Sequence, residues 1–453
     1  MDMRPFFFLA WGGLAALSLG CGGGFLPLEK SRGEELFSLP GKKAEPPSGG
    51  TQKGEFPRRP PGLEAYVRMG LAGNPGLRAA FDAWRAAARR VEWAAALPEP
   101  ALSWTHFVEA LETRTGPQRN QLGLSQALPW PGKLRAKKKV AAARAEALWA
   151  RALKKRAELV RDIRKAWYEY AWLGRAVEIT RSNLDLLKLL EPVVQRRVQA
   201  GGNQSEILRL QVEIGKVQNR LESLEDSRPA LSAALAALVG WKGRALLPWP
   251  VLEESEPARL DRERLVALLF EKNPDLAVLD KEVAIRGEEV GAARMERYPD
   301  FRVGLSWFQT GGARSGGVRG SGNDPWAFSI GVKIPLWVGK YDTEIRAARA
   351  SREAALGRLK DAKNNLFSSL ELALYRERDA ERRVALYRDS LVPRALRSYE
   401  VTRKAYEAGK ADLLDTVDQL RLLLEFRLAL WRARADRGKS LAEIEALCGG
   451  EIR

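Results

Sequence analysis

Few residues in this chain belong to the types that carry out acid–base or nucleophilic chemistry. Its 453 residues include one histidine, His106, and two cysteines, Cys21 and Cys448. His106 falls in a predicted strand, where a single His is usually structural, and no Ser/His/Asp, Cys/His or phosphate-loop pattern accompanies it. These residues supply no soft-metal ligand set either. The sequence therefore predicts no enzymatic activity, no cofactor and no resident metal.

A pair of carboxylates, Asp415 and Asp418, forms the other candidate for chemistry. Three residues apart on a predicted helix, the two side chains share a face. Acids near the start of a helix are also favoured by its dipole, and nothing nearby in the sequence supplies a substrate pocket. On the residues alone, the favoured interpretation is a solvated helix end.

The first 61 residues are typical of an export signal followed by a tether. Arg4 precedes an apolar run that ends at Leu19, which predicts a signal peptide over residues 1–20. A small residue before Cys21 is how bacterial lipoprotein signals end, so we expect lipidation at Cys21; ordinary signal-peptidase cleavage nearby is the alternative. Residues 21–61 are rich in Gly, Pro and Lys, which predicts a lipid-anchored, extended tether.

The charge pattern argues against nucleic acid as a partner. The formal net charge is +18, but Lys and Arg are spread along predicted helices among Glu and Asp. No aromatic and basic binding signature accompanies them, so they indicate solvated helix surfaces.

After the tether, a series of landmarks occurs twice in the same order. The offset between corresponding landmarks drifts only from about 199 to about 209 residues, as a tandem duplication with small loop insertions would give. This predicts a first repeat over residues 62–250 and a second over 251–453. The landmark pairs are Asn74-Pro75 and Asn273-Pro274, Leu102-Ser103-Trp104 and Leu305-Ser306-Trp307, Pro131-Gly132-Lys133 and Val338-Gly339-Lys340, Ala200-Gly201 and Ala408-Gly409, and Leu238-Val239-Gly240 and Leu447-Cys448-Gly449.

Each repeat carries two predicted strands with a period-2 pattern. We expect them at about residues 100–108 and 119–128, and at about 301–309 and 326–336. One face is apolar, with Trp near the strand ends, which fits the wall of an outer-membrane barrel; hairpins on a soluble sheet are the alternative. Four strands cannot close such a barrel, since about eight is the minimum. Three chains would supply twelve.

Two very long helices follow the strands, from about Lys133 to Ala200 and from about Lys340 to Ala408. Each would extend roughly 100 Å. Apolar residues occupy more than one stripe on each helix, so each could pack against neighbours on two sides, as a closed helical wall requires. Pro192 and Pro393 should bend these helices locally.

From about residue 62 to 449 the chain resembles the TolC family of outer-membrane efflux proteins. The most specific stretches run from Gln126 to Lys133 and from Tyr406 to Asp415, and the former is similar to the heavy-metal (CzcC/CusC-like) branch. The resemblance implies a mainly α fold with a small β part, and a homotrimer that forms a 12-stranded β-barrel and a 12-helix periplasmic tunnel. It also implies the role of a passive exit duct in the outer-membrane lipid, which receives substrates, heavy-metal cations among them, from a periplasmic adaptor (membrane fusion protein) and an inner-membrane efflux pump of the RND type.

The same resemblance assigns roles to residues at the periplasmic end. Gly201 and Gly409 would lie at the two hairpin tips, where an adaptor docks. Asp415 and Asp418 match the acidic constriction of the family, with Glu206 and Tyr406 completing the gate. In a threefold assembly the aspartates would form stacked rings that select cations. Glu206 corresponds to Asp415 in the first repeat, but Arg209 stands opposite Asp418, so the polar latch departs from the family pattern.

A periplasmic adaptor-like protein is the alternative function, because adaptors also contain long helical hairpins. An adaptor would have one hairpin flanked by soluble β domains. Here the hairpin is duplicated and the strands carry a membrane-facing pattern, which favours the duct.

Overall fold

The computed structural model describes residues 25–37, 62–241, 243, 246–252, 260–450 and 452. The predicted signal peptide and the predicted lipidation site, Cys21, lie outside these residues. The chain divides into two compact units: unit 1 comprises Met1–Phe81, Ala152–Pro274 and Asn364–Arg453, and unit 2 comprises Asp82–Arg151 and Asp275–Lys363. Each unit therefore takes segments from both halves of the sequence.

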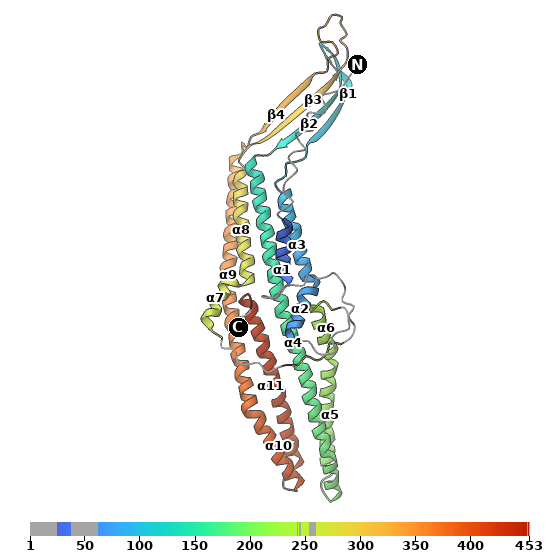
Figure 1. Cartoon of the computed structure of the whole chain (residues 1–453), viewed down its shortest axis with the longest axis vertical. Helices are drawn as coiled ribbons and strands as arrows, with labels where there is room; N and C mark the ends of the chain where they lie inside the picture. The colour runs from blue at the N-terminus through green and yellow to red at the C-terminus, as the bar shows by residue number, and fades with distance from the viewer. Residues whose placement is uncertain are drawn as a thin grey trace. The chain divides into compact units, whose positions relative to one another are not determined.

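The order of elements is the same in the two halves of the chain: two shorter helices, two strands, a long helix and a returning helix (Figure 1). In the first half these are α2 (Leu63–Gly73), α3 (Pro75–Trp93), β1 (Ala101–Thr113), β2 (Gly116–Leu128), α4 (Pro131–Gln199), α5 (Ser205–Asp226) and α6 (Arg228–Leu238). In the second half they are α7 (Arg262–Lys272), α8 (Pro274–Met295), β3 (Asp300–Thr310), β4 (Trp326–Lys333), α9 (Val338–Leu386), α10 (Val392–Glu407) and α11 (Leu413–Leu447).

The two Asn-Pro landmarks perform the same task in each half. The Asn74 side-chain oxygen accepts a hydrogen bond from the Leu77 amide at 3.0 Å, which caps α3. The Asn74 amide group donates to the Leu238 carbonyl at 2.9 Å, and Asn273 donates to the Leu447 carbonyl at 2.8 Å. Each Asn thereby fastens the start of one helix to the end of the last helix in the same half.

The sheet in unit 2 is antiparallel, with strand order β1-β2-β3-β4. One face carries apolar rows that cross all four strands, and the other carries small and polar residues. The apolar face includes the rows Leu102, Leu124, Leu305, Phe328 and Trp104, Leu122, Trp307, Trp326, and the opposite face includes Ser103, Gly123, Ser306 and Ala327. Within the described residues, β1 and β4 each have an edge with no neighbouring strand.

The first hairpin extends further than its apolar pattern indicated. β1 continues to Thr113 and β2 already begins at Gly116, because a tight turn joins the two strands directly. Gly116 has φ of +132°, and a Cβ there would lie 1.8 Å from the Gly311 carbonyl oxygen, so the turn requires glycine. β4 ends at Lys333, before the expected end near residue 336; Pro335 follows and has no amide hydrogen for a ladder.

The prediction of an extended tether over 21–61 is wrong for part of that segment. Residues Phe25–Phe37 form a helix, α1. Leu36 is fully buried, and the Phe37 ring meets Phe81 edge-on with centroids 5.5 Å apart. The composition of the whole segment concealed these apolar residues, whose burial offsets the cost of ordering the helix.

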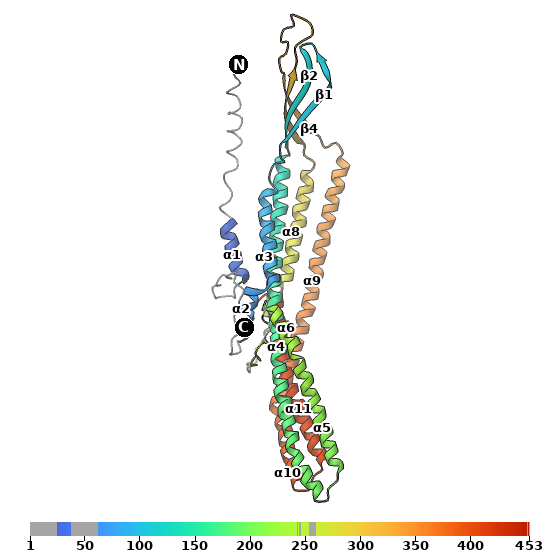
Figure 2. The same ribbon diagram turned by 90° about the vertical axis from the view of Figure 1, so that its right-hand side faces the viewer.

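In unit 1, α10 packs along α11, and Arg181 of α4 pairs with Glu225 of α5 at 2.5 Å; Figure 2 shows these helices at one end of the chain. Ile163, Trp167 and Tyr170 of α4 are buried, as the helical spacing indicated. Ion pairs also hold the helices together: Glu169 of α4 pairs with Arg432 and Lys439 of α11, and the buried Arg437 pairs with Glu377 of α9. No helix among the described residues has the length and apolar content needed to cross a membrane.

The second long helix is not continuous. A π-helical turn, Tyr387–Leu391, separates α9 from α10. Pro393 stands in the first turn of α10, where its missing amide hydrogen costs little. The wider turn provides the local distortion expected at this proline. In contrast, α4 runs through Pro192 as a single helix.

Candidate gate at the hairpin tips

The two helical hairpins of unit 1 end in turns of the same type. Gly201, between α4 and α5, has φ of +98°, and Gly409, between α10 and α11, has φ of +75°. After each glycine, the next amide donates back across the helix end: Gly202 to the Arg197 carbonyl at 2.9 Å, and Lys410 to the Ala405 carbonyl at 2.8 Å. This is the Schellman pattern, which needs a left-handed residue and hence favours glycine. The tips therefore follow from local backbone chemistry.

Tyr406 and Glu206 connect the two hairpins. The Tyr406 hydroxyl donates to Glu206 Oε2 at 2.9 Å, and both side chains are buried. Burial, reinforced by this hydrogen bond, raises the pKa of Tyr406 to about 12, so the phenol is a neutral donor at physiological pH. Arg197 lies over the Tyr406 ring at 4.7 Å and donates to the carbonyls of Tyr406 and Ala411. The tip of the second hairpin is thus held from both sides by the first.

A second connection lies further from the tips. Arg421 of α11 makes a bidentate contact with Glu213 of α5, with Nε to Oε1 at 2.7 Å and Nη2 to Oε2 at 2.5 Å. The Arg421 guanidinium holds the pKa of the Glu213 carboxyl below its usual range, although burial opposes this effect. The same guanidinium donates from Nη1 to Asp418 at 2.9 Å. One arginine therefore bridges two carboxylates from different hairpins.

The predicted gate residues divide into two groups. The structure brings Glu206 and Tyr406 into direct contact. Asp418 is partly exposed and paired with Arg421, whereas Asp415, in the first turn of α11, is exposed and has no hydrogen-bond partner among the described residues. Asp412 caps α11 by accepting from the Leu413 amide at 2.7 Å.

Sequence reasoning missed Arg197, Glu213 and Arg421. A signal for two of them was present, because Glu213 and Arg421 are 208 residues apart, the same offset as the glycine tips. When the two repeats are aligned at this offset, the acid Glu213 is aligned with the base Arg421. Arg197 had no comparable signal, since its contacts depend on how the hairpins pack.

The candidate gate is a cluster of charged and hydrogen-bonded side chains. No group of three or more His, Cys, Asp or Glu residues in the described part of the chain is placed to hold a metal ion. The exposed Asp415 is suited to attract passing cations, whereas the half-exposed Asp418 already pairs with Arg421.

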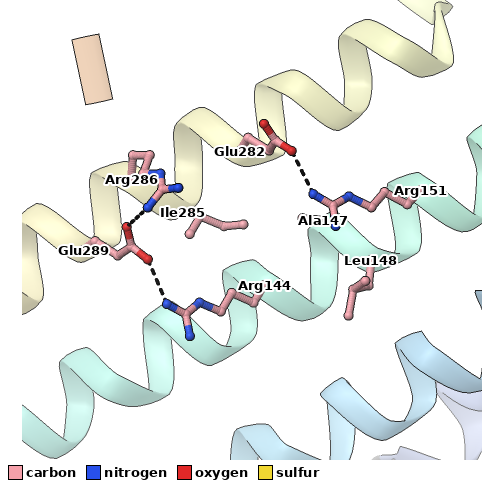
Figure 3. Close-up of a pocket in the computed structure, with 8 residues that line it drawn as sticks. All are labelled: Arg144, Ala147, Leu148, Arg151, Glu282, Ile285, Arg286 and Glu289. Carbon is pink, nitrogen blue, oxygen red and sulfur yellow. Dashed lines mark hydrogen bonds and ion pairs between the residues drawn. The ribbon is translucent and has the colours of Figure 1, made fainter. Parts of the chain in front are cut away.

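A shallow pocket in unit 2 is also charged, as Figure 3 shows. Arg144 and Arg151 of α4 pair with Glu289 and Glu282 of α8 at 2.9 and 2.8 Å. Arg286 also pairs with Glu289, at 2.7 Å. Since each arginine that lines the pocket has an acidic partner, these contacts join two helices and leave no cation available for an anionic ligand.

Comparison with known proteins supplies relatives and solved structures. Residues 265–450 match the family model described as outer membrane efflux protein. Nodulation protein T from Rhizobium leguminosarum bv. trifolii is 22% identical over 410 residues, which cover 86% of this chain and 85% of that protein. Cobalt-zinc-cadmium resistance protein CzcC from Cupriavidus metallidurans is 24% identical over 388 residues, which cover 82% of this chain and 87% of that protein.

The crystal structure of the outer membrane protein VceC from Vibrio cholerae shares the fold. It superposes with a TM-score of 0.69 at 20% identity, covering 86% of this chain and 97% of that one. The mainly helical, TolC-like fold expected from the sequence is therefore confirmed, as is the family resemblance.

Proposed function

We propose that this chain is the outer-membrane exit duct of a tripartite efflux system, because residues 265–450 match the outer membrane efflux protein model and the chain shares the fold of VceC. Three copies would assemble a 12-stranded β-barrel and a 12-helix periplasmic tunnel. Substrates would pass through this duct passively, after delivery by an inner-membrane pump of the RND type and a periplasmic adaptor.

The observation that carries this proposal is the sheet of unit 2. Its apolar face presents Trp104, Phe328 and Ile330 to solvent, each more than 60% exposed. A surface of this kind marks a membrane or protein contact. Both edges of the sheet lack a neighbouring strand among the described residues, and four strands are too few to close a membrane barrel. Lipid would cover the exposed apolar face, and further copies of the chain would pair with the two open edges.

The hairpin tips would form the periplasmic gate. In a threefold assembly, Asp415 and Asp418 of three chains would create acidic rings at the entrance, selective for cations. The Tyr406–Glu206 and Arg421–Glu213 contacts would hold each pair of hairpins in the closed arrangement. The tips at Gly201 and Gly409 would be the surfaces on which the adaptor docks.

We also propose heavy-metal cations as substrates and lipidation of Cys21 after removal of residues 1–20. The name of the relative CzcC supports the first proposal, and the Gly20-Cys21 sequence supports the second. A duct that conducts cations without a tight ligand set would rely on the pump for selectivity.

Planar-bilayer recording of the purified full-length protein tests the duct. We expect trimers that insert spontaneously, conduct cations in preference to anions and are blocked by polyvalent cations. Protein that never forms conducting units would contradict the proposal. Metal tolerance of a deletion strain, complemented with this chain, tests the substrate; unchanged tolerance to cobalt, zinc and cadmium would exclude these metals.

A further inference from the structure

Two junctions between a strand and a long helix occupy equivalent positions in the duplicated chain. The first, between β2 and α4, contains Trp130-Pro131-Gly132-Lys133, and the second, between β4 and α9, contains Trp337-Val338-Gly339-Lys340. The backbone geometry agrees in both: the Lys133 amide donates to the Trp130 carbonyl at 2.9 Å, and the Lys340 amide donates to the Trp337 carbonyl at 3.0 Å. The same local turn therefore presents a tryptophan and a lysine at each site.

At the first junction both side chains are occupied by the start of the adjacent strand. Lys133 is buried, and its Nζ donates to Asp300 Oδ2 at 2.9 Å. The Trp130 amide donates to Asp300 Oδ1 at 3.1 Å, and the Trp130 ring stacks on Tyr298 with centroids 5.3 Å apart. The residues Tyr298-Pro299-Asp300 thus form a receptor for the Trp and Lys that follow β2.

At the second junction the same groups are exposed. Trp337 is 76% exposed, Lys340 is exposed, and no described residue forms an ion pair with this lysine. β4 is an edge strand, so the chain supplies no further strand whose start could receive them.

The missing receptor is present at the opposite edge of the sheet. Leu97-Pro98-Glu99 precedes β1 as Tyr298-Pro299-Asp300 leads into β3: a large aliphatic or aromatic residue, a proline and an acid. Leu97 is 53% exposed and Glu99 is exposed, without an ion-pair partner in the described chain. β1 is the other open edge of the sheet. One copy therefore presents an unoccupied Trp and Lys beside β4 and an unoccupied apolar residue and acid beside β1, the same kinds of group that meet between β2 and β3.

Resting on the trimeric duct proposed above, we infer that Lys340 and Trp337 of one copy bind Glu99 and Leu97 of the next copy, repeating between chains the contact that Lys133 and Trp130 make with Asp300 and Tyr298 within the chain. The occupant of each open edge is thus a second copy of this chain, joined heterologously around a closed ring. The antiparallel order of the sheet permits this, since β4 and β1 run in opposite directions. Burial of Trp337 would supply most of the affinity, and the lysine–carboxylate pair would fix the partner and the register.

Crosslinking of the full chain in detergent tests this pairing. Glu99→Cys and Lys340→Cys are combined in a Cys448→Ala background and treated with a short bismaleimide, since the span of an ion pair exceeds that of a disulfide. We expect a covalent trimer ladder. The matched control combines Lys340→Cys with Glu109→Cys, an exposed acid further along β1, and should give none. Variants with one introduced cysteine account for any reaction through Cys21.

Charge reversal provides the second measurement. Lys340→Glu should dissociate the trimer in mild detergent, measured as the molar mass by light scattering, and adding Glu99→Lys should restore it. If the native protein is a trimer but residues 99 and 340 do not crosslink, or the double charge reversal does not restore the trimer, the proposed pairing is wrong. The proposed duct function would be unaffected by that result. A monomeric protein under native conditions would overturn both.

Discussion

The α4–α5 and α10–α11 hairpins have the same type of tip, but their side chains perform opposite tasks. The first hairpin supplies the carboxylates of both connections, Glu206 and Glu213, and each is buried. The second supplies the donors, Tyr406 and Arg421, and keeps Asp415 exposed. Duplication thus preserved the backbone of the tips, while the equivalent positions Glu213 and Arg421 came to carry opposite charges. A closed gate held in this way would open when donor and acceptor separate.

Arg421→Glu should break this complementarity most strongly. It would place a third acid beside Glu213 and Asp418 and leave the buried Glu213 with only Lys216, 3.7 Å away, as a cationic partner. The cost is roughly 2 kcal/mol, below the range for fully buried pairs because Arg421 is partly exposed. In bilayers we expect the closed–open equilibrium to shift roughly 30-fold towards conducting states. Arg427→Glu on the same helix is the matched control, because Arg427 contacts no acid in the described chain.

Asp415→Asn tests whether the exposed acid of the second hairpin faces the conducting path. Removing one charge from each of three chains should weaken block by polyvalent cations about tenfold. Asp418→Asn should have a smaller effect, since Arg421 already neutralises Asp418. Glu425→Gln, another exposed acid on α11, should leave the block unchanged. Equal block in all three variants would place Asp415 outside the path.

Tyr406→Phe removes a single hydroxyl from the other connection. Glu206 would lose its hydroxyl donor at a cost of about 1 kcal/mol, the low end of the range for a buried acceptor that loses one partner. We expect a modest rise in conductance, roughly fivefold in the closed–open equilibrium. Tyr399→Phe, whose hydroxyl has no hydrogen-bond partner in the described chain, should behave as wild type. Identical behaviour of both variants would mean that the bond does not hold the gate.

Mild acid should produce the smallest effect. The pKa of Glu213 in the folded chain lies below its ordinary value of 4.5. Between these two values the unfolded state therefore binds more protons than the folded state. The stabilisation is therefore complete above pH 4.5 and is lost as the pH falls through the lowered value. A thermal melt that declines below pH 4.5 in wild type should decline less in Glu213→Gln. A parallel decline in both proteins would assign the acid response to other carboxylates.

Much of this fold could be predicted from local pattern. The Asn-Pro pairs, the period-2 strands and the glycine tips each reflect chemistry within a few residues, and the structure contains each of them. The α1 helix was missed because the Gly and Pro content of its surroundings outweighed its own apolar residues. The break at 387–391 was expected only as a bend, since a proline shows where a helix is disturbed but not how.

The candidate site was less accessible from sequence. Glu206 and Tyr406 were identified through the family resemblance, but their direct bond was not. Arg197 and Arg421 appeared to be ordinary surface cations, because a helix sequence does not show which cation meets a carboxylate on another hairpin. For Arg421 alone, the sequence offered a clue to the partner: its separation of 208 residues from Glu213 equals the separation of the two tip glycines.

The π-helical turn before Pro393 has a consequence for the angular phase of α10. An α-helix advances about 100° per residue, so the extra residue accommodated by a π turn rotates everything after it by about that amount. Tyr406 lies on α10, downstream of this rotation, and its hydroxyl reaches Glu206 only with the phase that the turn provides. The number of residues between α9 and the tip therefore matters as much as which residues they are, because this number sets the direction in which the Tyr406 side chain points. Deleting one residue from 387–391 should return this turn to α-helical geometry and rotate Tyr406 away from its acceptor.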